Sequence, residues 1–154
     1  MSTEHKLNQE RREELKLLYP WYKEEVFRRR EQMAWLTGFA SGVLVLVLVL
    51  LLIVPAAVSP DGIVKVFAGS GVVVFSGIVA YLVLQQRARH LLAKQVLVTI
   101  ERELGLYEEG RFFEGAALYP TDWQTAWTRD SSVTIYLSIL AALTGLVLAA
   151  VLLR

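Results

Sequence analysis

Three long apolar runs constrain the fold of this chain more than any other feature. They are centred on VLVLVLVLLLIV at 43–54, VFAGSGVVVFSGIVAYLVL at 66–84 and SVTIYLSILAALTGLVLAAVLL at 132–153. Each lies in a charge-free stretch of about 20 residues or more, the length at which an α-helix crosses a hydrocarbon core of about 30 Å. The many valines do not indicate strands, because a lone strand in lipid leaves its backbone groups without hydrogen-bond partners. We therefore expect an all-α membrane protein with three transmembrane helices.

Composition agrees with a membrane protein and excludes several other classes. Hydrophobic residues make up 55% of the 154 positions, and the mean hydropathy is +0.44. The net charge is only +1, so we expect no nucleic-acid partner. The chain has no cysteine, which excludes disulfides, zinc–thiolate sites and thiol nucleophiles.

The basic residues predict how the chain is placed in the membrane. Eight precede the first run, Lys65 alone lies between the first and second runs, and six lie between Arg87 and Arg129. Because cytoplasmic loops carry an excess of Lys and Arg, we expect the N-terminus to be cytoplasmic and the C-terminus outside. The expected segments are a cytoplasmic amphipathic helix at 1–35, transmembrane helices at 36–58, 63–84 and 131–153, and a cytoplasmic helix with an aromatic interfacial segment at 85–130.

The first two spans are expected to continue as long cytoplasmic helices. Apolar residues recur on one face of each, at Leu15, Leu18, Tyr22, Val26 and Met33 in the first, and at Leu92, Val96, Ile100 and Leu104 in the second. Packing of these faces would form a stalk, either within one chain or between subunits. Gly105 is placed to end the second helix as its C′ residue.

Aromatic residues gather just ahead of the first and third spans. The tripeptide Leu-Tyr-Pro occurs at 18–20 and again at 118–120, and glycines at 105, 110 and 115 exclude one long helix between the second and third spans. We expect interfacial belts at headgroup depth, made of Tyr19, Trp21, Trp35, Tyr119, Trp123 and Trp127.

Small residues recur in all three spans. Such residues let helix backbones approach closely, which favours helix association in lipid. The sequence therefore predicts packing or homo-oligomerisation positions at Gly38, Gly42, Gly71, Gly77, Ala141, Gly145 and Ala149. Basic residues next to the first two spans are candidates for binding lipid headgroups, or act only in setting topology: Arg28, Arg29, Arg30, Arg87, Arg89 and Lys94.

No pattern of a catalytic, cofactor or metal site is present in the sequence. The centres of the spans carry no charge, which counts against a pump or transporter. Phosphate-binding glycine loops, nucleophile elbows and HExxH are all missing from the sequence. Solvated helix faces explain the carboxylates Glu101, Glu103, Glu108, Glu109 and Glu114. We expect neither an enzyme nor a cofactor.

The order of elements resembles two groups of small membrane proteins. RRREQMAWLTGF at 28–39 enters a span, LLAKQVLVTIERELGLYEEG at 91–110 continues the next, and LYP at 118–120 precedes the last. This arrangement, with ELGLY at 103–107, resembles the homo-oligomeric bacterial inner-membrane proteins of the RipA type. It is also similar in plan to the two-span SLATT-type effectors, which are thought to perforate membranes. The resemblance implies a bacterial inner-membrane homo-oligomer without catalytic residues.

The leading expectation is therefore a non-enzymatic homo-oligomer in the inner membrane that acts as a scaffold, or as a ring or pore. One alternative is a small accessory subunit of a larger complex, in which another membrane protein meets the small residues. A further alternative is a membrane-permeabilising effector, whose expression would dissipate the membrane potential.

Overall fold

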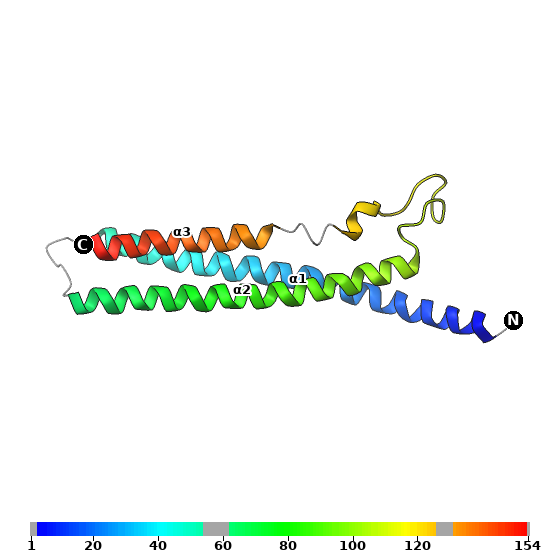
Figure 1. Cartoon of the computed structure of the whole chain (residues 1–154), viewed down its shortest axis with the longest axis horizontal. Coiled ribbons are helices and arrows are strands. Elements are labelled where there is room, and N and C mark those ends of the chain that lie inside the picture. Colours follow the sequence, from blue (N-terminus) through cyan, green and yellow to red (C-terminus); the bar gives the residue numbers. More distant parts are fainter. Residues whose placement is uncertain (1–2, 54–61, 126–130, 154) are drawn as a thin grey trace. The chain divides into compact units, whose positions relative to one another are not determined.

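The computed structural model describes residues 3–53, 62–125 and 131–153, with side chains described from residue 9 onward. Helix α1 comprises Thr3–Ile53, α2 comprises Gly62–Leu104 and α3 comprises Ser132–Leu153, and a short 3₁₀ helix, η1, occupies Thr121–Gln124 (Figure 1). The three long helices contain windows of mean hydropathy 2.8, 2.1 and 2.5 and are long enough to cross a membrane. An all-helical chain with three such helices is therefore confirmed.

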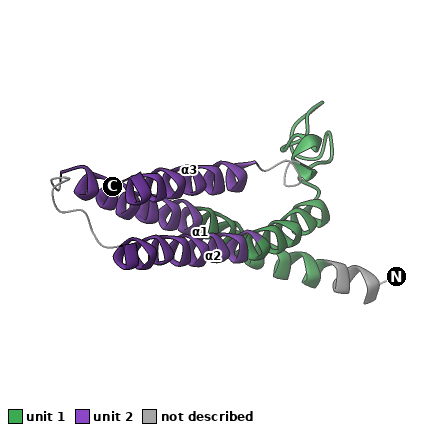
Figure 2. Ribbon diagram, turned by 60° about the vertical axis from the view of Figure 1, so that its left-hand side comes forward, with its two compact units in different colours: residues 1–30, 88–130 green, residues 31–87, 131–154 purple. Residues whose placement is uncertain are grey.

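The chain divides into two compact units, which Figure 2 colours separately. Unit 1 comprises residues 1–30 and 88–130, and unit 2 comprises residues 31–87 and 131–154. Both α1 and α2 contribute to each unit as unbroken helices, and α1 passes through Pro20 without interruption. The 43 residues of α2 rise roughly 65 Å, about twice the thickness of a hydrocarbon core. Lipid tails therefore cannot surround α2 along its whole length.

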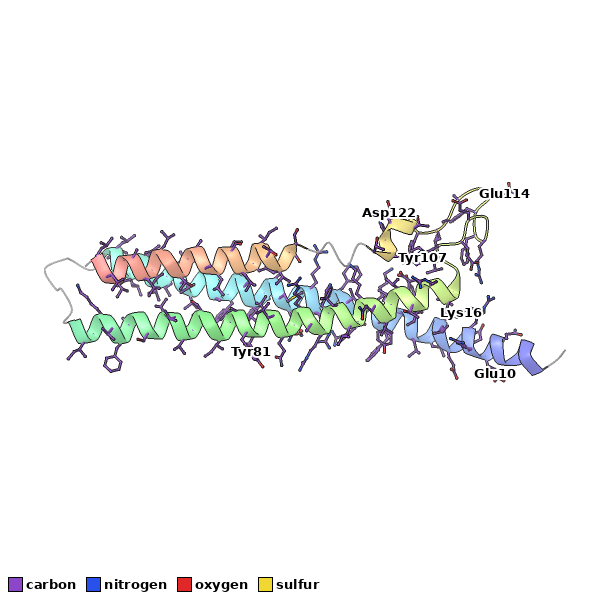
Figure 3. The ribbon with its side chains drawn as sticks, in the orientation of Figure 1. Glu10, Lys16, Tyr81, Tyr107, Glu114 and Asp122 are labelled. Carbon is purple, nitrogen blue, oxygen red and sulfur yellow. The ribbon has the colours of Figure 1, made fainter. Side chains whose placement is uncertain are left out.

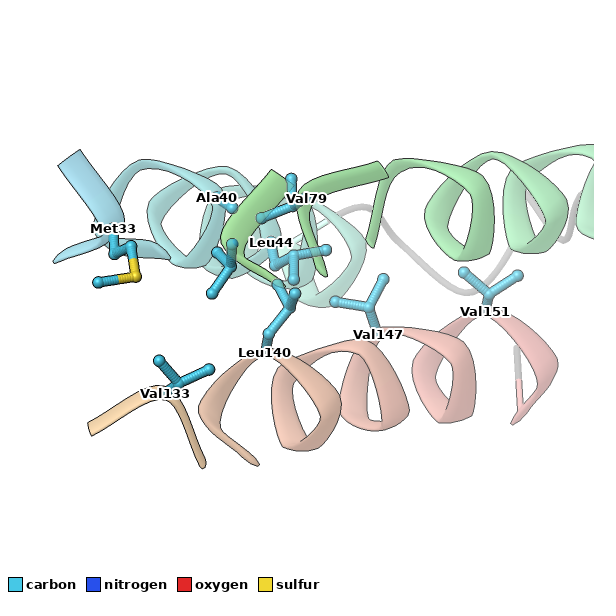
Figure 4. Close-up of a cluster of buried hydrophobic side chains, with 9 residues drawn as sticks. Met33, Ala40, Leu44, Val79, Val133, Leu140, Val147 and Val151 are labelled. Atoms are coloured by element: carbon cyan, nitrogen blue, oxygen red, sulfur yellow. The ribbon is translucent and has the colours of Figure 1, made fainter. Parts of the chain in front are cut away.

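Unit 2 is a bundle of three helices around one seam of aliphatic side chains. The buried side chains come from all three helices (Figure 4) and are Met33, Ala40, Leu44, Val79, Val83, Val133, Leu140, Val147 and Val151. The buried Thr37 and Ser76 also belong to this seam. Successive seam positions within a helix are three, four or seven residues apart. An alternation of this kind gives a repeat of about 3.5 residues and is typical of left-handed coiled-coil packing.

Two hydroxyl groups cross-link the bundle. The Ser76 and Thr144 hydroxyl oxygens lie 2.7 Å apart, and the Thr144 hydroxyl also lies 2.7 Å from the Leu140 carbonyl. Since a hydroxyl has one proton and Thr144 donates it to that carbonyl, Ser76 donates to Thr144. The bond joins α2 to α3 inside the apolar seam.

Unit 1 pairs α1 with the second half of α2, and the buried face of α2 differs from the predicted one. His90, Ala93, Leu97 and Ile100 are buried, again at steps of three and four residues. Of the predicted face, Leu92 is 63% exposed and Val96 is 40% exposed. Leu92 and Val96 therefore do not pack within the chain, because four-residue steps drift round an α-helix whereas a 3.5-residue repeat keeps one face inward.

Gly105 ends α2 as predicted, in a Schellman motif. Its φ is +75°, its N–H donates to the Arg102 carbonyl at 2.9 Å, and the Leu106 N–H donates to the Glu101 carbonyl at 3.0 Å. These two bonds satisfy carbonyls that the helix end would otherwise leave without a donor. The chain then leaves the helix axis as a segment, residues 105–125, that is irregular up to Pro120 and contains η1 near its end. This segment is called the strap below.

Candidate functional site

The strap folds back beside the end of α2 and is held there by backbone hydrogen bonds. Gly105, Gly110 and Gly115 all have φ near +75°, a conformation that side chains disfavour, so each glycine permits a change of direction. The Tyr119 N–H donates to the Leu106 carbonyl at 3.0 Å, which returns the strap to the point where it left the helix. The sequence prediction that glycines exclude one long helix here is confirmed.

A cluster of aromatic and acidic side chains fixes the strap to both helices of unit 1. The Tyr107 hydroxyl donates a short hydrogen bond to the Glu101 carboxylate, and both residues are 8% exposed. The hydroxyl oxygens of Tyr19, on α1, and Tyr119 lie 2.9 Å apart. The Tyr119 ring contacts the rings of Tyr107 and Trp123, with centroids 6.2 Å and 5.4 Å away. We call Tyr19, Glu101, Tyr107, Tyr119 and Trp123 the tyrosine cluster, and Figure 3 labels Tyr107 near the end of α2.

Burial raises the pKa of two hydroxyls of this cluster. Burial, together with the hydrogen bond to the Glu101 carboxylate, raises the pKa of Tyr107 well above its ordinary value. Burial and the hydrogen bond with Tyr119 do the same to the pKa of Tyr19. A neutral phenol can donate to a carboxylate, whereas a phenolate would repel it. The electrostatics of the cluster therefore match its hydrogen bonds.

One of the five carboxylates that were expected to be solvated is buried. Glu101 is buried and accepts the Tyr107 bond, so it does not lie on a solvated helix face. Glu103, Glu108, Glu109 and Glu114 are exposed, as expected. Within the described ranges, the acidic and histidine side chains form no group of three or more that could hold a metal ion. The cluster's donor–acceptor pairs are suited to holding the strap in place.

The predicted packing residues of the spans lie away from the seam of unit 2. All seven are exposed, namely Gly38, Gly42, Gly71, Gly77, Ala141, Gly145 and Ala149. A Cβ added at any of the five glycines would meet no other atom within 4 Å. Gly71 and Gly77 do not share one face, because six residues correspond to a rotation of about 120° from one to the other. Contacts within the chain therefore do not use these small residues.

The predicted interfacial aromatics separate into two groups. Tyr19 and Tyr119 contact each other, and Trp123 packs on Tyr119. Trp21 is 62% exposed and Trp35 is 70% exposed, with Trp35 stacked on Phe39 at a centroid distance of 5.7 Å. Trp127 lies outside the described residues. The repeated Leu-Tyr-Pro sequence thus marks two tyrosines that meet in unit 1.

The predicted headgroup-binding residues also differ in their surroundings. Arg28 pairs with Glu24 at 2.6 Å, and Arg29 pairs with Glu25. The remaining four are Arg30, Arg87 and Arg89, which are exposed, and Lys94, which is partly buried. Exposed guanidinium groups remain able to meet lipid phosphates.

Sequence reasoning missed Tyr107 and Glu101 as a structural pair. The position of Glu101 in the helix could have indicated its burial. Glu101 lies four residues after the apolar Leu97, which is buried, and so falls near the same helix face. An acidic residue near an apolar face needs a donor, and Tyr107 lies just beyond the Gly105 stop. No family model, curated protein or solved structure matches this chain.

Proposed function

We propose that this chain is a non-enzymatic protein of a bacterial inner membrane whose copies assemble side by side as a scaffold or ring. In this proposal the apolar windows cross the membrane, unit 1 lies in the cytoplasm and the C-terminus lies outside. The proposal is supported by what a single copy leaves uncovered. In each of the three apolar windows only 17% of the residues are buried.

The position of the small residues is the observation that carries the proposal. The seam of unit 2 is built from Val, Leu, Met and Ala40 and contains no glycine, whereas Gly38 and Gly42 lie on the far side of α1 with open space around them. Helices in lipid associate where small residues let backbones approach. Placing these glycines outward leaves them free to contact the helices of other copies.

Leucine at Gly42 tests this proposal. The added side chain meets nothing in the single copy, so the fold of one chain should persist while close approach between copies is blocked. Copies labelled with donor and acceptor fluorophores and reconstituted in liposomes should lose energy transfer with Gly42→Leu. Val66→Leu is the matched control, because Val66 is 68% exposed and already too large for close helix approach. Equal energy transfer in both variants would count against assembly through α1.

The orientation is tested by labelling. The parent chain has no cysteine, so a cysteine at Ser2 or at an appended C-terminal position reacts alone. An impermeant maleimide should label only the C-terminal cysteine in intact cells. Labelling of both ends from one side would contradict the proposed orientation.

A further inference from the structure

The exposed surface of α1 carries its charge in two separate strips. With a rotation of about 100° per residue, four basic side chains fall within about 40° of one another around the helix, and these are Arg12, Lys16, Lys23 and Arg30. Five acidic side chains fall in a sector centred about 120° away, and these are Glu10, Glu13, Glu14, Glu24 and Glu31. All of these side chains are exposed. We call the two sets the basic strip and the acidic strip.

The two strips carry equal and opposite net charges. The four members of the basic strip give +4. Arg28 also lies on the acidic side, where it pairs with Glu24 at 2.6 Å, so five carboxylates and one guanidinium give −4. The other charged side chains of residues 9–31 are paired away from the strips, in the pairs Arg11 with Glu103 and Arg29 with Glu25.

Contacts within the chain leave both strips available to a partner. Lys16 pairs with Glu13 at 2.8 Å, with side chains 61% and 64% exposed, and Lys23 lies over the Tyr19 ring at 5.7 Å. Exposed local contacts of this kind contribute little to stability. In the part of the chain that the structure describes, no ion pair joins the basic strip to the strap. Neutralisation of the strips therefore requires another molecule.

The strips match each other in height along α1. Lys23 and Glu24 are consecutive residues, so they differ by only about 1.5 Å along the helix axis. The same holds for Arg30 and Glu31. The other two members of the basic strip lie within about 3 Å in height of a glutamate of the acidic strip. Copies that stand upright in one membrane with one orientation therefore present the two strips at the same levels.

Opposite charges at matching heights favour a second copy as the partner. Two upright copies can bring +4 against −4, whereas two like strips would repel. Charged residues in register on parallel helices select partner and orientation in coiled coils in the same way. Lipid headgroups cannot cover the strips if α1 crosses the membrane as proposed, because the basic strip extends roughly 27 Å from Arg30 to Arg12 and the headgroup layer is only about 5–8 Å thick on each side.

The acidic strip continues into the apolar part of α1 as the outward glycines. Gly38 follows Glu31 by seven residues and Glu24 by fourteen, and Gly42 follows Gly38 by four. These four residues therefore lie within about 40° of one another around the unbroken helix. The side of α1 that is proposed to meet other copies through its glycines is thus the side that carries the acidic strip.

We infer that the acidic strip of one copy docks against the basic strip of the next copy, with the two α1 helices parallel and in register. This inference rests on the proposed function, since it assumes assembled copies. Leu17 and Trp21, which are 78% and 62% exposed, lie within the acidic strip and add apolar contact. The contact is head-to-tail, because it joins different surfaces of the two partners. Its repetition around an axis along the membrane normal generates a ring.

Exchange of charges between the strips tests the inference in liposomes that hold donor- and acceptor-labelled copies. Lys16→Glu with Lys23→Glu, or Glu14→Lys with Glu24→Lys, turns attraction into repulsion at two levels. Each double variant should raise the protein-to-lipid ratio at half-maximal energy transfer roughly tenfold or more. All four substitutions in one chain restore opposite charges at both levels and should return the parent's value, as should a mixture of the two double variants. The basic residues at 28–30, beside the span, are unchanged, so the orientation is retained.

A matched control and the remaining outcomes separate the strip contact from other effects. Glu109→Lys with Glu114→Lys reverses two exposed carboxylates of the strap and should leave energy transfer unchanged. Weaker assembly in the double variants without recovery in the fourfold variant would reject pairing between the strips. Unchanged energy transfer in every charge variant of a parent that assembles would reject the strip contact and leave the proposed assembly standing. A parent that shows no energy transfer would reject both.

Discussion

Replacing Tyr107 by phenylalanine removes one hydroxyl from the tyrosine cluster and leaves its ring in place. The lost group donates to the carboxylate of Glu101, which is 8% exposed and so has little access to water as a substitute partner. A hydrogen bond to a charged group contributes about 1.5–3 kcal/mol, and leaving a buried acceptor without its donor costs a similar amount. We expect opening of the strap to become easier by about 1.5–3 kcal/mol.

Hydrogen exchange of the strap amides measures this directly. The Tyr119 N–H donates to the Leu106 carbonyl only while the strap is closed, so its exchange reports opening. A loss of 1.5–3 kcal/mol corresponds to exchange roughly 10- to 150-fold faster, at about 1.4 kcal/mol for each factor of ten. Mass spectrometry of peptides covering residues 106–125, in detergent or nanodiscs, resolves a change of this size.

Two controls separate the hydroxyl from general effects of substitution. Tyr81→Phe removes a hydroxyl that projects from α2 into the surroundings, where Tyr81 is 65% exposed, and should leave strap exchange unchanged (Figure 3). Glu101→Gln retains an acceptor for Tyr107 and should show a smaller acceleration than Tyr107→Phe. Strap exchange in Tyr107→Phe that stays within twofold of the parent would show that this bond does not hold the strap.

Three further changes have defined outcomes. Gly105→Ala forces a side chain to adopt φ +75° against the Arg111 guanidinium, so we expect a loss of at least about 1–2 kcal/mol in strap stability, seen as faster proteolysis at 105–125. Because folding raises the pKa of Tyr19 and Tyr107 above 10.0, the strap's stability should be constant below about pH 10 and fall as pH rises further, and tyrosinate absorbance should appear together with strap exchange. Ser76→Ala removes the α2–α3 hydrogen bond to a threonine hydroxyl and should lower resistance to unfolding in denaturing detergent by roughly 0.6 kcal/mol.

The number of long apolar helices could be predicted from the sequence, because each arises from a charge-free run of membrane-spanning length. The helix stop at Gly105 could also be predicted, since a glycine after an apolar periodic segment is a local signal. These features depend on neighbouring residues alone.

The buried seam could not be predicted in the same way. In the run at 43–54 every residue is apolar, so hydrophobicity does not distinguish the buried Leu44 from the exposed Leu46. In unit 1, Leu92 is apolar and exposed whereas His90 is polar and buried, so the apolar pattern alone did not identify the face that packs within the chain. Packing against neighbouring helices, and not residue type, selects the inward positions.

The tyrosine cluster lay beyond sequence reasoning for a different reason. Tyr19 and Tyr119 are 100 residues apart, and nothing local indicates that their hydroxyls meet. Glu101 looked like an ordinary surface carboxylate because its donor, Tyr107, reaches it only after the chain has turned at Gly105. Long-range contacts of this kind depend on the complete fold of unit 1.

Native mass spectrometry of the protein expressed alone and released from detergent determines whether copies of this chain assemble with one another. We expect a single homo-oligomeric mass that persists at low protein concentration. A monomer under conditions that keep the helices folded would contradict this expectation, and co-purification of a different membrane protein with that monomer would favour an accessory subunit instead.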